Sequence, residues 1–104
     1  MNTNLDSCLK LILPRALEPQ FIGHLLQHPE WVGPFSTHLV EGHGDPESIA
    51  SIAEQVRGRA ERVQVEILLE SQHAQQLIEH LRRELPSKEI VWWLSPVLAM
   101  GSFA

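Results

Sequence analysis

Hydrophobic residues recur at every second position in several stretches of the chain, as in strands with one buried face. In CLKLIL, Leu9, Leu11 and Leu13 share one side and Lys10 takes the other. FSTHLVEG alternates in the same way, and ERVQVEILLE is the clearest case. EIVWWLSPV is interpreted as a last strand, and its Pro96 favours a sheet edge because proline lacks a backbone donor. We predict strands over residues 8–13, 35–42, 61–70 and 89–97.

Two other stretches carry apolar residues at helical spacing. The first begins near Pro19, which suits a first helical turn, and ends at Pro29, because the residue before a proline avoids the helical region. The second begins with Ser71 as a cap and runs to about Leu85. The apolar stripes are Phe21, Ile22, Leu25 and Leu26 in the first helix, and Ala74, Leu77, Ile78, Leu81 and Leu85 in the second.

The connection between the second and third strands is long, spanning about residues 42–60. It opens with GHGDP, a cluster of residues that interrupt regular structure. Asp45 then suits a helix cap, and PESIASIAEQV has apolar residues at helical spacing. We therefore predict a long loop that contains a short helix.

The order of elements is strand, helix, strand, long loop, strand, helix, strand. Two such units with right-handed crossovers give an α+β fold of βαββαβ order, with both helices on one face of a four-stranded antiparallel sheet. We predict one domain over residues 1–104. The other sheet face carries Ile12, Leu68 and a tryptophan. That apolar surface predicts association between copies of the chain, and the apolar tail LAMGSFA predicts packing on a neighbour.

The composition narrows the range of functions. The chain has a formal net charge of −5 and a pI near 5.6, which argues against general nucleic-acid binding. Cys8 is alone, so no internal disulfide is expected. We see no secretion signal and no apolar run that approaches the roughly 20 residues of a membrane span. We therefore expect a cytoplasmic protein without direct membrane insertion.

The sequence Gly42-His43-Gly44 has two interpretations. The favoured one is a hinge, in which the glycines allow a tight bend and the histidine lies on the loop. The alternative is a metal site, which needs at least two further ligands and finds candidates in His38 and Glu41. Neither GxGxxG nor GxxxxGK occurs, so no phosphate-binding fingerprint is present.

Three arginines, Arg57, Arg59 and Arg62, surround Gly58 in this acidic chain. Arginine pairs well with phosphates and carboxylates, and the glycine allows a ligand to approach the backbone. The alternative, pairing with neighbouring glutamates, is favoured because surface ion pairs are common and carry little information.

Four further histidines lie on the predicted helices. His24 and His28 are one turn apart on the first, and His73 and His80 are seven residues apart on the second. Without the glutamate of the zinc proteases, HxxxH is a weak metal signal, so exposed positions are favoured. No spacing in the sequence indicates a catalytic nucleophile paired with a base, and we therefore expect no enzymatic activity.

Beyond these local features, the chain resembles the PII signalling superfamily, which has a ferredoxin-like βαββαβ fold. The resemblance covers nearly the whole chain and lies in LKLILP, VEGHG, VRGRAERVQVEI and IVWWLSPV. These stretches are similar to a PII-like branch often encoded beside heavy-metal efflux genes, and more distantly to the CutA divalent-ion tolerance proteins. The glycine-rich turn of ATP-binding PII proteins is absent from residues 86–90, and the chain has no tyrosine to modify.

The resemblance implies a homotrimer in which residues 42–60 form the T-loop, a mobile effector arm. It places effector sites in the clefts between subunits, near the loop bases. Gly42, His43, Gly44, Arg57 and Arg59 are then the candidate effector residues, with Lys88 nearest to an incoming phosphate. We expect a nitrogen-regulatory-type sensor that responds to a small molecule or metal, of unknown identity, and contacts a protein target such as a membrane transporter. The alternative is a metal-binding module for divalent-cation tolerance.

Overall fold

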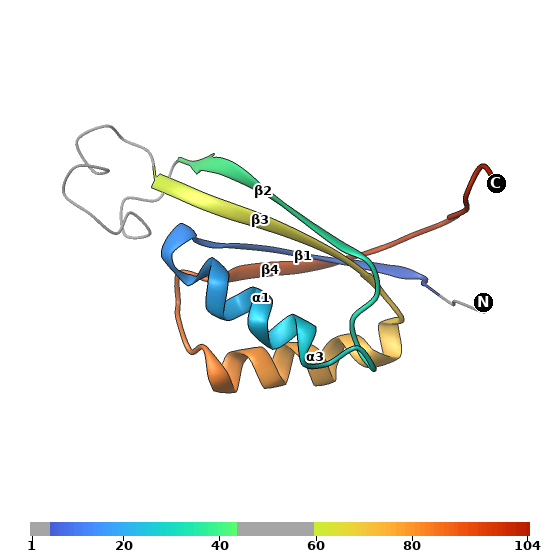
Figure 1. Cartoon of the computed structure of the whole chain (residues 1–104), viewed down its shortest axis with the longest axis horizontal. Coiled ribbons are helices and arrows are strands. Elements are labelled where there is room, and N and C mark those ends of the chain that lie inside the picture. The colour runs from blue at the N-terminus through green and yellow to red at the C-terminus, as the bar shows by residue number, and fades with distance from the viewer. Residues whose placement is uncertain (1–4, 44–59) are drawn as a thin grey trace.

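The computed structural model describes residues 5–43 and 60–104, which form a sheet with two α-helices packed on it (Figure 1). In chain order the elements are β1 (Ser7–Pro14), the 3-10 helix η1 (Arg15–Leu17), α1 (Glu18–Leu26), β2 (Phe35–Gly42), β3 (Ala60–Leu69), α3 (Ser71–Glu84) and β4 (Val91–Pro96). The four strands lie in the order β2-β3-β1-β4, and each neighbouring pair is antiparallel. The predicted ferredoxin-like βαββαβ fold is confirmed. The short helix predicted within 42–60 lies outside the described residues.

Both helices cover the same face of the sheet (Figure 1), and the core lies between them and the strands. Leu9 stands opposite Ile67 and Leu11 opposite Val65, so aliphatic pairs cross the sheet. Leu9, Val65 and Ile67 are fully buried, and each such side chain contributes about 1.5–3 kcal/mol. From the helices the core receives Phe21, Leu25, Ala74, Leu77, Ile78 and Leu81. We call this side the covered face.

The opposite side, the open face, has mixed chemistry. Trp93 stands opposite Lys10 and Trp92 opposite Leu11, so the two tryptophans point to opposite sides of β4, as predicted. Lys10 in turn stands opposite Glu66 on its other neighbour. Trp93 is 41% exposed. The open face thus presents an aromatic ring beside charged groups.

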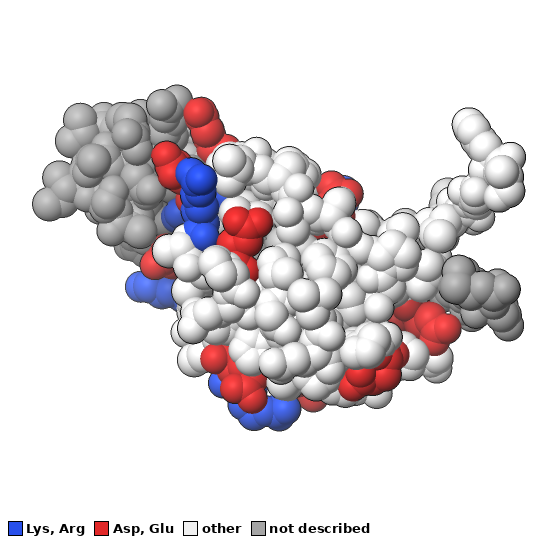
Figure 2. Space-filling model, viewed as in Figure 1, with Lys and Arg blue, Asp and Glu red and all other residues white. Residues whose placement is uncertain are grey.

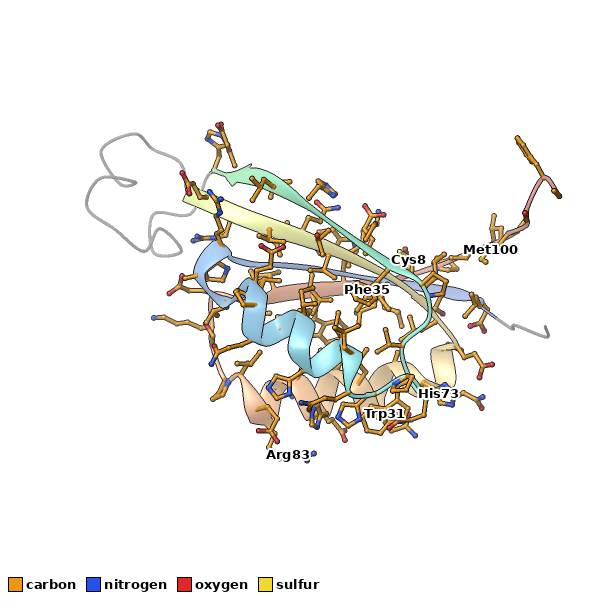
Figure 3. All side chains as sticks on the ribbon, in the orientation of Figure 1. Cys8, Trp31, Phe35, His73, Arg83 and Met100 are labelled. Carbon is orange, nitrogen blue, oxygen red and sulfur yellow. The ribbon has the colours of Figure 1, made fainter. Side chains whose placement is uncertain are left out.

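The strand β4 lies at the edge of the sheet, as Pro96 predicted. Val97 N–H donates to the Asp6 carbonyl at 2.9 Å, and beyond this bond the chain leaves the domain. Figure 3 shows the segment with Met100 standing clear of the side chains that fill the core. Leu98 is 96% exposed, and Phe103 is fully exposed. Within one chain the apolar tail therefore does not reach a packing partner.

The helix ends differ in detail from the predictions. The helix α1 ends at Leu26, short of Pro29, because the Gln27 and His28 N–H groups each bond to a carbonyl three residues back at 3.2 Å. That tighter turn closes the helix before proline can. In residues 5–43 and 60–104 no helix is long and apolar enough to cross a membrane.

The first turn of α3 is capped by a residue that is distant in sequence. Ser71, predicted to be the cap, is instead the first helical residue. Its N–H donates to Asp6 Oδ1 at 2.8 Å, and its hydroxyl donates to Asp6 Oδ2 at 3.1 Å. These hydrogen bonds, the backbone one above all, lower the pKa of Asp6. A carboxylate just before β1 thus satisfies the first amide of a distant helix, where the helix dipole also favours negative charge.

Candidate functional site

The adjoining ends of β2 and β3 meet where the resemblance predicts an effector site. Gly42 pairs with Ala60, and Glu41 stands opposite Glu61. Arg15, directly after β1, brings its Nη1 within 3.4 Å of Glu61 Oε2. Figure 2 shows acidic and basic side chains side by side at this end of the molecule, whereas the middle of the same view is largely uncharged. We define the loop base as Arg15, Glu41–His43, Glu61 and Arg62.

Arg62 is the buried charge of the loop base, with 4% of its surface exposed. Its Nη1 donates to the Glu61 carbonyl at 3.2 Å, and its Nη2 lies 3.7 Å from Glu89 Oε2. The separation between Nη2 and Oε2 is too long for a hydrogen bond. Neither Arg62 Nη2 nor Glu89 Oε2 has a hydrogen-bond partner among the described residues. The ion partner of Arg62 is thus Glu89, and not one of the neighbouring glutamates that the sequence analysis favoured. A buried guanidinium with an unused N–H is well suited to bind an oxyanion.

The predicted effector residues divide into described and undescribed ones. Gly42 and His43 lie at the end of β2. Lys88 is exposed in the turn before β4, and it directly precedes Glu89, the ion partner of Arg62. The turn that carries Lys88 is thereby tied to the loop base. Gly44, Arg57 and Arg59 lie outside the described residues.

Two of the three residues of the predicted metal site lie together. His43 Nε2 is 3.8 Å from Glu41 Oε2, and both side chains are exposed. His38 is three residues before Glu41 on β2, so it points to the opposite face of the sheet. As the side chains stand, no group of three His, Cys, Asp or Glu residues in the described ranges is arranged to hold a metal ion.

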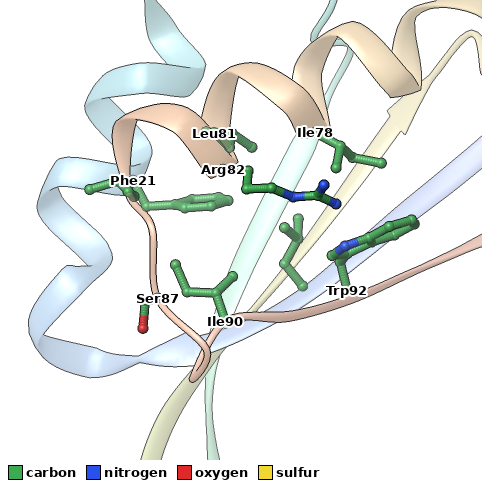
Figure 4. A pocket seen from close by; sticks show the side chains of 9 residues that line it. Phe21, Ile78, Leu81, Arg82, Ser87, Ile90 and Trp92 are labelled. Atoms are coloured by element: carbon green, nitrogen blue, oxygen red, sulfur yellow. The ribbon is translucent and has the colours of Figure 1, made fainter.

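The two cavities of interest differ in size and lining. A concavity of about 300 Å³ lies at the loop base, where Leu39 and Val40 join the charged residues, and this is the lower end of the range for ligand sites. A cavity of about 100 Å³ lies between α1, α3 and β4 (Figure 4). Its lining is mainly apolar, and Arg82 extends across it near Trp92. Of these two cavities, the one at the loop base is the better place for a small polar ligand.

A second polar cluster, away from the loop base, joins the two helices. His28 Nε2 lies 3.1 Å from His80 Nε2, so the segment just after α1 contacts α3 through two imidazoles. The His24 ring centroid lies 5.4 Å from that of His80. Trp31 stacks on His28 at 4.8 Å with 12° between the planes, and Figure 3 shows it at the rim of the helix layer. We call His24, His28 and His80 the histidine cluster.

The electrostatics of this cluster follow from its packing. Desolvation lowers the pKa of His80, and the neighbouring His28 adds to the shift, while Glu84 opposes it. Glu30 Oε2 lies 3.0 Å from His28 Nδ1, and this hydrogen bond lowers the pKa of Glu30. Near neutral pH an uncharged His80 and an ionised Glu30 therefore lie on either side of His28, an arrangement suited to hydrogen bonding or to metal binding.

The sequence interpretation favoured exposed positions for these histidines, and it is wrong, because His24, His28 and His80 are half-buried. His24 precedes Leu25 in α1 and His80 precedes Leu81 in α3, so both border the apolar stripe of their helix, whereas His28 lies two residues past the end of α1. The position of His24 and His80 beside the stripe is the signal from which their approach to the helix–helix contact was predictable. The pairing of His28 with His80, 52 residues apart, depends on how α1 and α3 pack.

One known protein family matches nearly the whole chain. A family model described as "Protein of unknown function (DUF3240)" matches residues 3–104. No curated protein matches the sequence.

Among solved structures, a DUF3240 family protein from Shewanella baltica superposes with a TM-score of 0.75 at 17% identity, covering 98% of this chain and all of that one. CPII, a nitrogen regulatory PII-like protein from Thiomonas intermedia bound to ADP, AMP and bicarbonate, gives 0.69 at 12%, covering 94% and 96%. CutA1 from Pyrococcus horikoshii gives 0.71 at 9%, covering 93% and 88%. At these identities the structural likeness shows the fold alone, which this chain shares with PII-like and CutA proteins.

Proposed function

The chain belongs to the DUF3240 family, and we propose that it is a PII-like sensor whose loop base binds a small anionic effector. Binding changes the conformation of the connection between β2 and β3, and thereby its contact with a protein partner such as a membrane transporter. The protein acts by binding rather than by catalysis. It works in the cytoplasm as a homotrimer, with each loop base in a cleft between subunits.

The observation that carries the proposal is the unfinished pairing of Arg62. Glu89 neutralises its charge from 3.7 Å but makes no hydrogen bond to Nη2. An effector oxyanion at hydrogen-bond distance replaces this loose contact with a shorter, charge-assisted one. Because the guanidinium is buried, that exchange is screened less than it is at an exposed site.

Displacement of Glu89 also supplies a way to transmit the signal. Glu89 belongs to the turn that leads into β4, and Lys88 beside it can follow the anion. Arg62 belongs to β3, close to where that strand begins at Ala60. An effector that binds Arg62 and Lys88 therefore acts on both the start of β3 and the turn before β4. It needs only a modest difference in affinity between two states to shift their populations.

The structural neighbours suggest which anions to test first. CPII is described with ADP, AMP and bicarbonate bound, all of which are anionic. The loop base of the present chain offers Arg15, Arg62 and a concavity of about 300 Å³, and Lys88 directly precedes Glu89, the ion partner of Arg62. These features support the same class of effector here.

The trimer is supported by apolar surface that one chain leaves uncovered. Trp93 on the open face is 41% exposed, and Leu98 in the tail is 96% exposed. Further copies of the chain can bury both, and their junctions form the clefts that the proposal needs.

Thermal-shift measurements with AMP, ADP and bicarbonate test the proposal. We expect at least one of them to raise the melting temperature of the wild type by several degrees at saturating concentration. Arg62→Gln and Lys88→Ala should reduce that shift, whereas Arg83→Ala, an exposed charge on α3, should not. Equal shifts in all four proteins would contradict an effector site at the loop base. The absence of any shift in the wild type would exclude these three effectors.

A metal-binding module for divalent-cation tolerance is the second candidate function. The contact of His43 with Glu41 at 3.8 Å favours it, with His38 of a neighbouring subunit as a third donor. Calorimetric titration of zinc, copper and nickel into wild type and His43→Ala tests it. This function requires loss of a stoichiometric site in the variant.

A further inference from the structure

We propose that His28 and His80, joined by His24, form a site for a late first-row divalent metal ion such as Ni²⁺, Cu²⁺ or Zn²⁺. The site lies on the helix layer, and it shares no residue with the loop base. It is therefore independent of the effector site proposed above, and also of the metal candidates His43, His38 and Glu41.

The spacing of the two imidazole nitrogens is the first argument. Metal–imidazole bonds are about 2.0–2.1 Å long, so two nitrogens on one ion lie about 2.9 Å apart at a right angle and about 3.4 Å apart at the tetrahedral angle. The two Nε2 atoms, 3.1 Å apart, lie within that interval. Two donors, one on α3 and one just past the end of α1, are thus already spaced as ligands.

The surroundings of His28 are the second argument. A metal-bound histidine usually gives its other ring N–H to a carboxylate, which fixes the tautomer and makes the ligand nitrogen more basic. Glu30 Oε2 stands 3.0 Å from His28 Nδ1, which places the N–H on that nitrogen and the lone pair on Nε2. Trp31 stacks on the same ring and holds its plane. The lone pair of His28 therefore faces His80.

His24 is the third donor. It lies on α1, four residues before His28, which follows the end of that helix, and its Nδ1 is buried without a hydrogen-bond partner among the described residues. Its ring does not converge with the other two as it stands, in keeping with the lack of any three-residue metal group in the described ranges. Rotation of the His24 side chain brings a nitrogen toward the pair, and water completes the coordination. The metal thereby gives a partner to a buried polar atom that lacks one.

The competing explanation is that His28 and His80 only share a hydrogen bond that links α1 to α3. One ring then donates through Nε2–H and the other accepts. Such a bond stabilises the fold but gives no affinity for metal ions. Measured metal affinity therefore separates the two explanations.

The test is calorimetric titration of Ni²⁺ and Zn²⁺ at about pH 7.5, where ordinary imidazole is mostly neutral. The full chain is used without a histidine tag and after treatment with a chelator. We expect one site per chain in the wild type. His28→Ala and His80→Ala should each weaken it at least about 100-fold, and His24→Ala about 10-fold or more. Glu30→Gln should weaken it by about 10-fold, because it removes only the outer carboxylate.

Two histidine variants serve as matched controls. His73→Ala changes a histidine of the same helix that pairs with Glu70 at 3.6 Å and lies two turns from His80. His43→Ala changes the candidate ligand at the loop base. Both should bind metal at the histidine cluster as the wild type does, and neither His28→Ala nor His80→Ala should alter the thermal shift with nucleotides.

The proposal is overturned if the wild type binds neither metal, or if His28→Ala and His80→Ala bind as tightly as the wild type. Circular dichroism verifies that each variant is folded. If an alanine variant fails to fold, His28→Gln and His80→Gln take its place, because glutamine keeps a polar side chain of similar length at the helix contact. Undiminished affinity in those folded variants overturns the proposal equally.

Discussion

The two faces of the sheet differ in chemistry although the same strands build both. On the covered face, Leu9 and Ile67 lie opposite each other without a charged neighbour and are fully buried. On the open face, Lys10 lies between Glu66 and Trp93. Along the central strands β1 and β3 the two helices exclude water from the covered face, whereas at its edges Leu39, Trp92 and Leu94 are 60%, 39% and 41% exposed. The open face combines groups that one chain can neither bury nor fully solvate, and it therefore indicates contact with other molecules.

The largest expected effect comes from truncating neighbouring residues on the two faces. Ile67→Ala leaves a cavity in the core and should lower the free energy of unfolding by about 2–5 kcal/mol. Leu68→Ala, one residue along β3, removes a half-buried side chain from the open face and should cost about 1 kcal/mol. Urea denaturation measures both. Equal losses of unfolding free energy would contradict this difference between the faces, because they would show that the open face is buried as deeply as the covered one.

The mass of the protein in solution tests whether copies of the chain cover the open face. If three copies associate there, light scattering should give about 35 kDa, three times the chain mass of 11.8 kDa. Trp93→Glu places a charge in that contact and should reduce the measured mass to that of one chain. Leu26→Glu, at an apolar position of α1 that is 67% exposed, is the control and should leave the mass unchanged. A wild-type monomer would remove the clefts between subunits.

The fold was predictable because its determinants are local in sequence. Alternation around Leu9 to Leu13 gave β1 to within one residue at each end, and the helical spacing around Leu77 gave α3 equally well. The sites were less predictable, because they depend on pairs that only the fold brings together. Gly42, His43 and Lys88 were placed near the loop base by resemblance, whereas the pairing of Arg62 with Glu89 follows from how β3 and the turn before β4 pack.

A smaller effect is expected from the ion pairs of the loop base. Arg62 is 4% exposed and Glu89 30%, whereas Arg15 and Glu61 are each 57% exposed. Glu89→Gln removes the charge that neutralises Arg62 and should cost about 1–2 kcal/mol, less than for a fully buried pair because Glu89 reaches solvent. Arg15→Gln should cost about 0–0.5 kcal/mol. Urea denaturation at low and high salt compares the two, and equal costs would contradict the special role of Arg62.

The helix cap shows the same limit of sequence patterns at a smaller scale. Ser71 has the residue type of a cap and stands at the right place, yet Asp6, 65 residues earlier, accepts its amide hydrogen bond. Only the packing of the segment before β1 against the start of α3 brings the two residues together. A long-range cap of this kind carries no local signature.

The smallest expected effect is the pH dependence of that cap. The Ser71 amide lowers the pKa of Asp6 in the folded chain, so the carboxylate stabilises the fold at pH values above its ordinary pKa. That stabilisation fades as the pH falls through the lowered folded-state pKa. Asp6→Asn keeps an acceptor oxygen and removes the charge. Its urea midpoint should therefore lie below that of the wild type at about pH 6, and the two midpoints should converge as the pH falls through the lowered folded-state pKa. A gap that persists unchanged at acid pH would show that the carboxylate charge is not what holds α3 at its first turn.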